Sequence, residues 1–172
     1  MKKKMTQKLF DLSNKTIILT GSAGRLGSNF AEILADAGAN LVLIDINEKE
    51  NKKLEKRITK KFKIKCISSN ANITIKKELL ELAKIIIEKF GKIDGLVNNA
   101  FYNPRTNIEQ SARKFEDYSL DLWNDVVSVN LTGVFLCSQT FGKIMAKQKE
   151  GGSKRRMDDG SFYSRYSICT NV

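Results

Sequence analysis

The chain has 172 residues, a formal net charge of +11 and 41% hydrophobic residues. This length suits one domain with its own core, and the hydrophobic fraction argues against global disorder. No apolar run approaches the ~18 residues that a membrane span needs, and no apolar segment follows the N-terminal lysines. We therefore expect neither a membrane anchor nor a signal peptide.

The three cysteines, Cys66, Cys137 and Cys169, form no CxxC pair and no metal-ligand spacing. An odd number of scattered cysteines is typical of a reducing compartment, so we expect a cytoplasmic protein without a metal site.

The lysines are densest in "NEKENKKLEKRITKKFKIK", residues 47–65. Leu54, Ile58 and Phe62 recur there at helical spacing, which predicts a narrow apolar stripe beneath a solvated basic face. Nucleic-acid binding through this face is the alternative interpretation. No nucleic-acid motif accompanies the charge, so we expect no nucleic-acid partner.

The N-terminal part predicts a strand, a helix and a second strand. Residues 15–20, "KTIILT", form a short apolar run rich in β-branched side chains, as buried strands do. A helix is predicted from residue 25, with Gly38 placed as its C-terminal cap. Its predicted apolar face consists of Leu26, Phe30, Ile33 and Leu34. Residues 40–45, "NLVLID", predict the second strand.

After the lysine-rich helix, the strand and helix patterns continue to alternate. Residues 62–68 predict a weaker strand, residues 74–91 a helix, and residues 92–100 a fourth strand with its exit loop. Residues 101–119 are polar and predict an irregular loop. Residues 120–148 predict one long apolar helix facing the sheet.

Strands that alternate with helices of a dozen residues predict right-handed βαβ units. The fold class is therefore α/β: a Rossmann-type doubly wound parallel sheet with strand order 3-2-1-4, in three α/β/α layers. We place this domain at residues 1–150 and expect ligands at the carboxyl ends of its strands.

The stretch "TGSAGRLG" lies between the first strand and the first helix, with glycines at Gly21, Gly24 and Gly27. Glycines let a backbone turn approach a pyrophosphate, and the following helix N-terminus offers amide hydrogens. Asp45 follows at a strand end, at the ~20-residue separation of the dinucleotide fingerprint. A carboxylate there accepts ribose hydroxyls and repels a 2′-phosphate, which favours NAD over NADP. A tight turn with an unrelated surface aspartate is the alternative.

Four features together resemble the compact branch of the short-chain dehydrogenase/reductase family, over roughly residues 12–150. They are "TGSAGRLG", Asp45, "LVNNA" at 96–100 and "VNLTG" at 129–133. The resemblance implies an oxidoreductase that transfers a hydride between NAD(P) and an alcohol or carbonyl substrate. It also implies a small-molecule substrate, which the sequence does not name, and homo-oligomers among full-length relatives. We expect the chain as written not to assemble in the normal way.

The resemblance also assigns site residues. The turn supplies Thr20, Gly21, Ser22, Gly24, Arg25, Leu26 and Gly27 to the cofactor site. Asn98 and Ala100 are expected to line the adenine and ribose side, and Asn99 to steady the central strand. Asn72 and Ile73 stand where the family has an acidic and an aliphatic residue against the adenine.

The turn departs from the compact branch, which spaces its glycines TGxxxGxG. This chain has TGxxGxxG, typical of the larger, extended members, and Arg25 stands at the usual middle-glycine position. Phe101 also replaces the glycine that usually follows "NNA". Because "NNA" belongs to the compact branch, we interpret the turn as a variant of it.

Asn130 is the expected catalytic residue, the helix asparagine that holds a water in the family's proton relay. The family's acid/base is a tyrosine in Tyr-x-x-x-Lys, assisted by a serine. In this chain Tyr163 is followed four residues later by Ser167, and Tyr166 by Thr170. Ser161 and Tyr163 have the right side-chain types but no lysine partner. We therefore predict no turnover by the chain as written.

The family-like sequence gives way to a charged, unpatterned stretch after about Ser153. We expect residues 151–172 to be an aberrant or disordered tail, produced by a frameshift or a premature stop. Without a fifth strand, the sheet would keep an open edge and exposed apolar surface beside the fourth strand. A non-catalytic dinucleotide-binding module or regulator is the alternative hypothesis.

Overall fold

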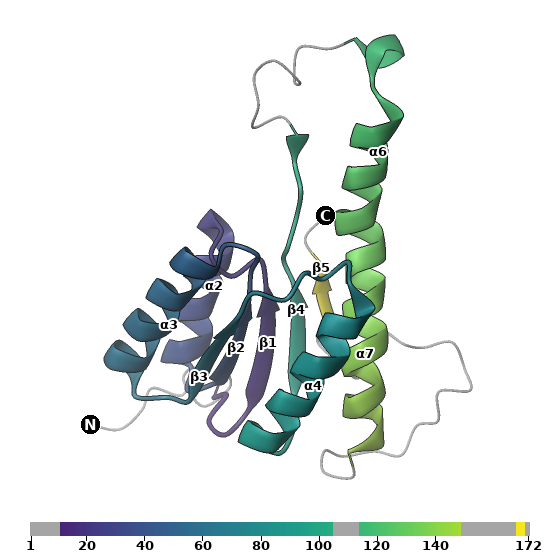
Figure 1. Cartoon of the computed structure of the whole chain (residues 1–172). Helices are drawn as coiled ribbons and strands as arrows, with labels where there is room; N and C mark the ends of the chain where they lie inside the picture. Colours follow the sequence, from purple (N-terminus) through teal and green to yellow (C-terminus); the bar gives the residue numbers. More distant parts are fainter. Residues whose placement is uncertain (1–10, 105–113, 149–167, 171–172) are drawn as a thin grey trace.

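The computed structural model describes residues 11–104, 114–148 and 168–170, and its centre is a parallel five-stranded sheet (Figure 1). The strand order is β3-β2-β1-β4-β5. The strands are β1 Thr16–Thr20, β2 Asn40–Ile44, β3 Cys66–Ser69, β4 Gly95–Asn98 and β5 Ile168–Thr170. The predicted α/β class and the order 3-2-1-4 are confirmed.

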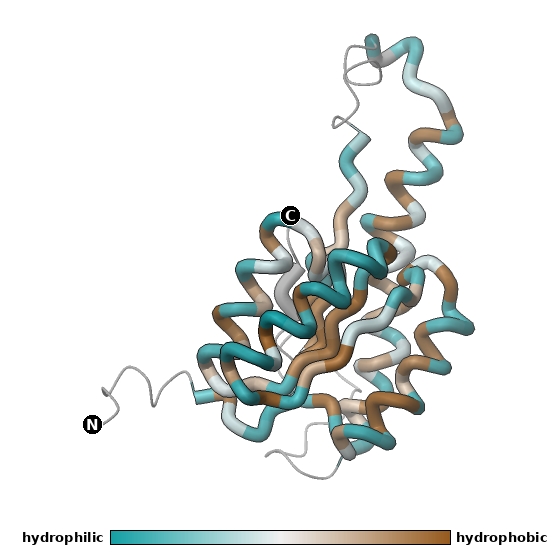
Figure 2. The backbone as a smooth tube through the Cα atoms, turned by 60° about the vertical axis from the view of Figure 1, so that its left-hand side comes forward, coloured by the Kyte–Doolittle hydropathy of each residue, from teal (hydrophilic) through white to brown (hydrophobic). Residues whose placement is uncertain are grey.

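Helices cover both faces of this sheet (Figure 1). The helices on one face are α2 Arg25–Asp36 and α3 Glu48–Phe62, and those on the other are α4 Lys76–Phe90 and α7 Val134–Lys147. Leu19 and Leu41 pack in the cluster with α2 and α3, whereas Ile18 and Val42 pack in the cluster with α4 and α7. Because both faces are buried, the strands are apolar throughout, and Figure 2 shows them as a hydrophobic centre between amphipathic helices.

Helix α2 uses a different face from the predicted one. Leu26 and Ile33 are 58% and 64% exposed, while Gly27, Ala31 and Ala35 are buried. Small side chains let the helix lie close against the strands, and close packing favours that contact over the burial of two larger side chains. Only Phe30 and Leu34 of the predicted face are partly buried against the core.

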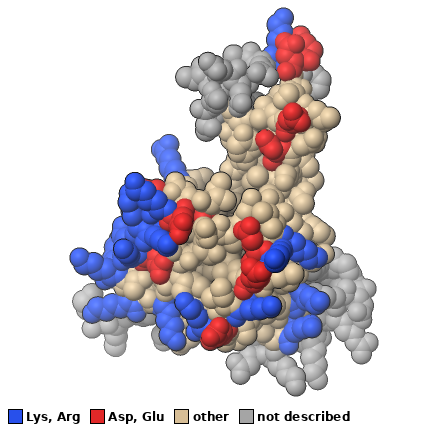
Figure 3. All heavy atoms as spheres, viewed as in Figure 1, with Lys and Arg blue, Asp and Glu red and all other residues tan. Residues whose placement is uncertain are grey.

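Helix α3 follows its prediction. Leu54 and Ile58 are buried, and Phe62 packs against the same cluster. Lysine and arginine side chains gather over the outer side of α3 (Figure 3). Lys61 and Arg57 pair there with Glu32 of α2 at 2.8 and 3.3 Å, so part of this charge links the two helices.

The predicted long helix is interrupted. It consists of α6 Leu120–Val127, the π-helical turn η3 Ser128–Gly133, and α7. Single π turns within α-helices occur often at functional sites. At the end of this turn, Gly133 packs so closely that a Cβ would lie 2.6 Å from Ile73 Cδ1. Helix α6 extends beyond the strand ends (Figure 1).

The predicted irregular loop at 101–119 includes a short 3-10 helix, η2 Phe115–Asp117, and residues 105–113 lie outside the described part of the chain. In addition, no helix among the described residues is long and apolar enough to cross a membrane.

The expected open edge beside β4 is wrong over three residue pairs. Ile168, Cys169 and Thr170 of β5 pair in parallel with Leu96–Asn98. An edge strand presents unpaired N–H and C=O groups, and isoleucine and threonine favour strand geometry, so a short segment can satisfy that edge. The rest of the predicted tail, residues 151–167 and 171–172, lies outside the described residues.

Candidate functional site

The turn between β1 and α2 is a tight backbone cradle. Gly21 has φ +65°, and a Cβ on it would lie 2.6 Å from Ala100 Cα. A Cβ on Gly27 would lie 2.0 Å from Gly21 O and 2.8 Å from Ser22 Cα. At Gly24 the nearest atom would be 3.3 Å away. Gly21 and Gly27 are therefore required by the packing of the turn, and Gly24 much less so.

The N-terminus of α2 opens at this turn. Its N-cap residue is Gly24, which provides no side-chain hydrogen bond, and the first turn contains no acidic residue. The first amide hydrogens and the positive end of the helix dipole therefore remain available to an anion. Arg25 and Leu26 are exposed at the same helix end.

Asp45 lies half-buried at the end of β2, next to the turn. Its Oδ2 accepts a hydrogen bond from Ala23 N at 2.9 Å, and its Oδ1 accepts one from Asn47 N at 2.9 Å. A carboxylate offers about four lone-pair sites, so each oxygen can accept a further hydroxyl. Asp45 thus links the turn to β2, and its two oxygens can still accept hydrogen bonds from a ligand.

Ser22 lies beneath the turn and not on its surface. Its side chain is fully buried, and its Oγ donates to Asn51 Oδ1 at 2.8 Å. Its amide donates to Ile44 O at 3.3 Å. The hydroxyl of Ser22 thus makes a structural contact with α3, and its predicted cofactor contact stays a prediction.

Sequence reasoning missed Asn51, which is 1% exposed on α3. The signal was present in the sequence: Asn51 stands three residues before Leu54, in register with the apolar stripe of that helix. A polar side chain at a core position needs hydrogen-bond partners, and that requirement points to a specific contact.

Two side chains fasten the turn to the exit of β4. Thr20 Oγ1 accepts the amide hydrogens of Asn99 and Ala100, both at 3.0 Å. In return, Asn99 Nδ2 donates to the carbonyls of Thr20 and Gly21, both at 3.0 Å. Thr20 is 1% exposed, so its side chain holds β1 and β4 together and does not face a ligand.

Three residues assigned to the adenine side are used inside the protein. Ile73 is 7% exposed and belongs to the core. Asn98 is 4% exposed, and its Nδ2 donates to Ser138 Oγ at 3.2 Å. Asn72 Oδ1 accepts from Thr74 N at 3.0 Å and from Thr74 Oγ1 at 2.9 Å. The structure therefore brings the turn, Asp45 and Ala100 together, but directs these three side chains elsewhere.

Asn130 lies in the π turn η3 and faces the exit segment of β4. Its Oδ1 accepts from Tyr102 N at 2.8 Å, and its Nδ2 donates to Tyr102 O at 3.0 Å. The carboxamide thus fixes this turn of the helix to the segment after "NNA". Each end of the carboxamide keeps one further hydrogen-bonding position, which is what a bound water needs.

Comparisons with known proteins place this geometry in a family. The sequence profile described as short chain dehydrogenase matches residues 15–153. The chain belongs to the short-chain dehydrogenase family. It is 33% identical over 143 residues to 5-keto-D-gluconate 5-reductase of Escherichia coli (strain K12), which covers 83% of the chain and 53% of that protein.

Other members give the same result. Diacetyl reductase [(S)-acetoin forming] of Staphylococcus epidermidis is 35% identical over 139 residues, covering 81% of this chain and 51% of that one. The crystal structure of NAD⁺-bound xylitol dehydrogenase matches with a TM-score of 0.71 and 28% identity, over 80% of this chain and 50% of that one. The chain therefore spans about half the length of these short-chain dehydrogenases.

Two thiols of this short-chain dehydrogenase, Cys66 and Cys137, are not activated as nucleophiles. Burial raises the pKa of the Cys66 and Cys137 thiols to about 12, so neither is a thiolate near neutral pH. Across 11–104 and 114–148, no three His, Cys, Asp or Glu side chains gather as a metal site would require. Ser161 and Tyr163 lie outside the described residues.

Proposed function

We propose that this short-chain dehydrogenase binds NAD at the carboxyl ends of β1, β2 and β4. The observation that carries the proposal is the cradle itself: Gly21 and Gly27 leave no room for a Cβ, and the uncapped α2 N-terminus opens above them. A pyrophosphate fits such a cradle because backbone amides and the helix dipole both favour an anion.

Asp45 would accept the adenosine ribose hydroxyls. Its position is fixed by the hydrogen bond from Ala23, which ties the ribose end of the site to the pyrophosphate end. A 2′-phosphate would meet a carboxylate there, so NADP is the less favoured cofactor. The NAD⁺-bound xylitol dehydrogenase supports this choice.

The reaction class we propose is hydride transfer between NAD and an alcohol or carbonyl group of a small molecule. The reductases to which the chain is similar support this class. The nicotinamide supplies the hydride chemistry when bound, and Asn130 would hold a water beside the exit of β4. The 172 residues contain no tyrosine followed four residues later by a lysine. We therefore expect these residues alone to bind NAD without turnover.

Calorimetry of the 172-residue chain with NAD and with NADP tests the cofactor proposal. In the Asp45→Asn variant the NAD dissociation constant should rise about 10-fold or more, because a hydrogen bond to a charged group contributes about 1.5–3 kcal/mol. The preference for NAD over NADP should narrow as well. Asp36→Asn, which removes an exposed carboxylate at the far end of α2, serves as the control and should change neither value. A folded wild-type chain without saturable NAD binding would contradict the proposal.

The second candidate is a dinucleotide-binding module without catalysis, for which the cradle and Asp45 alone would suffice. An assay of NADH formation with a panel of secondary alcohols separates the two. Turnover by the purified 172 residues would exclude the module and overturn the expected inactivity.

We also propose that the basic face of α3 binds no nucleic acid, so DNA should not retain the chain even at low salt.

A further inference from the structure

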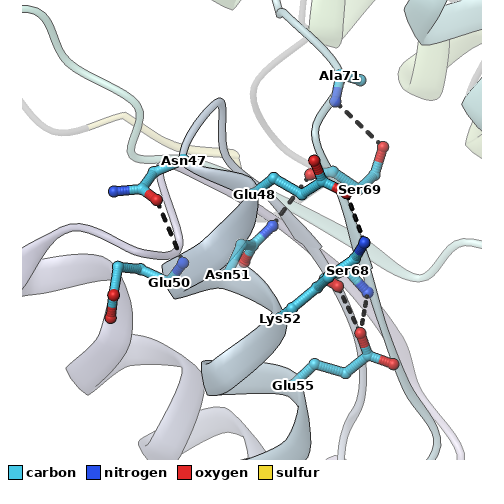
Figure 4. A network of polar contacts seen from close by, with 9 residues as sticks. All are labelled: Asn47, Glu48, Glu50, Asn51, Lys52, Glu55, Ser68, Ser69 and Ala71. Carbon is cyan, nitrogen blue, oxygen red and sulfur yellow. Dashed lines mark hydrogen bonds and ion pairs between the residues drawn. The ribbon is translucent and has the colours of Figure 1, made fainter.

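The carboxamide of Asn51 makes three hydrogen bonds inside the protein, and each goes to a different strand end. Its Oδ1 accepts from Ser22 Oγ at 2.8 Å, directly after β1. Its Nδ2 donates to Leu43 O of β2 at 3.1 Å and to Ser69 O of β3 at 3.0 Å. The acceptor oxygen and both amide hydrogens are therefore used. Figure 4 shows this side chain reaching from α3 to Ser69.

These strand ends carry the parts of the dinucleotide site. The turn after β1 forms the cradle, and Asp45 follows β2 by one residue. Asn51 therefore contacts both the turn and β2 from the side of α3, away from the open face of the cradle. No other side chain among the described residues bonds to the turn, β2 and β3 together.

The first turn of α3 borders a surface pocket. A surface pocket of about 310 Å³ is lined by Asn51, by its neighbours Glu48 and Lys52, and by Ser68 and Ser69 of β3. Polar side chains thus surround Asn51, whose own hydrogen bonds join the first turn of α3 to the cradle.

A second side chain of α3, Glu55, makes a comparable link that does not involve the cradle. Its Oε2 accepts hydrogen bonds from the amide and the hydroxyl of Ser68 (Figure 4). Glu55 thus fastens α3 to the edge strand β3 alone. The chain therefore offers a natural control for a test of Asn51.

We propose that Asn51 is a positioning residue for the dinucleotide site: through Ser22 it holds the glycine turn in fixed register with the ends of β2 and β3. The proposal rests on NAD binding at this turn. A cradle held in its binding geometry before the ligand arrives does not lose additional conformational entropy on binding, so the constraint appears as affinity. Asn51 itself touches no ligand, because it is buried beneath the turn.

The test compares NAD affinity and thermal stability in the full chain for Ser22→Ala, Asn51→Ala, the double variant and Glu55→Ala. Ser22→Ala should raise the NAD dissociation constant about 5-fold, the equivalent of one lost hydrogen bond. Asn51→Ala should raise it about 10-fold, and the double variant should be no worse than Asn51→Ala, because both remove one shared contact. Glu55→Ala should lower the melting temperature and leave the dissociation constant within about 2-fold.

Three results of this test would overturn the positioning role of Asn51. Unchanged affinity in Ser22→Ala, or equal losses in Ser22→Ala and Glu55→Ala, would overturn the positioning role and leave Asn51 as a stabilising residue only. Additive losses in the double variant would also overturn it, because Ser22 and Asn51 would then act separately.

A readout without ligand separates this proposal from the proposed function. The amide of Ala23, which lies in the turn, donates a hydrogen bond to Asp45. The rate of hydrogen exchange at this amide therefore reports how firmly the cradle is held. This amide should exchange about 5-fold faster in Ser22→Ala than in the wild type or in Glu55→Ala. If the wild type binds no NAD, the proposed function fails, and this exchange rate still decides whether Asn51 holds the turn.

Discussion

The two sides of the central strand β1 differ in how completely their polar groups are bonded. On the side of β2 and α3, the buried side chains of Ser22 and Asn51 are fully engaged. On the side of β4 and α7, two buried oxygens, Asn98 Oδ1 and Thr140 Oγ1, have no hydrogen-bond partner among the described residues. An unsatisfied buried polar atom costs about 1–3 kcal/mol.

Large apolar side chains are exposed on both sides of β1, but on the side of α7 they follow one another along a continuous run of helix. Leu120, Trp123, Leu131 and Phe135, along α6, η3 and α7, are between 56% and 71% exposed. This part of the molecule also shows few charged side chains (Figure 3). We call the side formed by β4, α6, η3 and α7 the helix side, and the side of β2, α2 and α3, with the proposed cofactor site, the cofactor side. The helix side carries the longer exposed apolar run and has the most to gain from further contacts.

The strongest way to break the cofactor side is to fill its cradle. A Cβ in Gly27→Ala would lie 2.0 Å from Gly21 O, so the turn must shift. We expect a loss of about 3 kcal/mol in unfolding free energy, and no measurable NAD binding. Urea denaturation and calorimetry measure the two effects.

Gly24→Ala is the matched control for Gly27→Ala, since its new Cβ would meet only Gly21 O at 3.3 Å. Its effect on stability should stay within about 1 kcal/mol. Equal damage from the two substitutions would contradict the view that Gly27 is the tighter position.

The next largest effect is expected at Thr20, where the end of β1 is hydrogen-bonded to the exit of β4. We call this contact the seam between the two sides. Thr20→Val removes the oxygen that accepts the amides of Asn99 and Ala100, at nearly constant side-chain volume. Two amides without an acceptor should lower the unfolding free energy by about 2–4 kcal/mol. Thr16→Val, equally buried in the same strand, removes a hydroxyl for which the described residues provide no bond. A similar loss in both variants would show that the seam does not depend on Thr20.

The helix side can be tested through self-association. We expect the exposed apolar side chains of the helix side to cause self-association. Replacing Leu131 and Phe135, which are 67% and 57% exposed, by glutamate should then reduce the apparent oligomer size in size-exclusion chromatography. The melting temperature should change by only a few degrees, because both side chains are already in water. As a control, Leu26→Glu changes an exposed apolar residue, 58% exposed, at the cofactor turn and should leave the oligomer size unchanged. An unchanged size in the double variant would refute this distinction.

A further prediction is a pH dependence from two thiols, the half-buried Cys66 at β3 and the buried Cys137 on α7. Burial raises the pKa of Cys66 and Cys137 from the ordinary 9.0 to about 12. Below pH 9 both states hold these protons, and the full contribution to stability is present. Between pH 9 and 12 the unfolded chain releases them while the folded chain keeps them, so stability falls as the pH rises.

Urea denaturation between pH 8 and 11 should show this fall, and it should be shallower in Cys137→Ala. Alkylation at pH 8.5, followed by mass spectrometry, checks the same burial: both thiols should react slowly in the native protein and quickly in urea. Rapid native labelling of Cys137 alone would show that the helix side opens, which would sharpen the contrast between the two sides.

Most of the fold could be predicted because its signals are local. Apolar runs of β-branched residues marked β1 and β2, and the stripe of Leu54 and Ile58 marked the buried face of α3. The face of α2 was wrong because large apolar residues there lie in solvent while alanines pack on the sheet. Periodicity counts apolar residues, but the distance between helix and sheet decides which of them are buried.

The positions of the candidate site residues could be predicted in part, for a related reason. The spacing of Gly21, Gly27 and Asp45 reflects backbone geometry along one segment, so the sequence contains it. The directions of Asn72, Asn98 and Ile73 depend on partners in other elements, and no pattern along the chain reports them. The π turn at Asn130 escaped prediction as well, because its apolar pattern continues that of the flanking helices.

The sequence by itself determined the family, the parallel sheet and the glycine turn, because each depends on residue types at short separations. Only the tertiary structure decided which polar side chains support that turn. Asn51 lies 29 residues after Ser22, and Asn99 lies 79 after Thr20, and hydrogen bonds over such separations form only once the strands are side by side. Their energy depends on burial and direction, and the folded arrangement of strands and helices sets both.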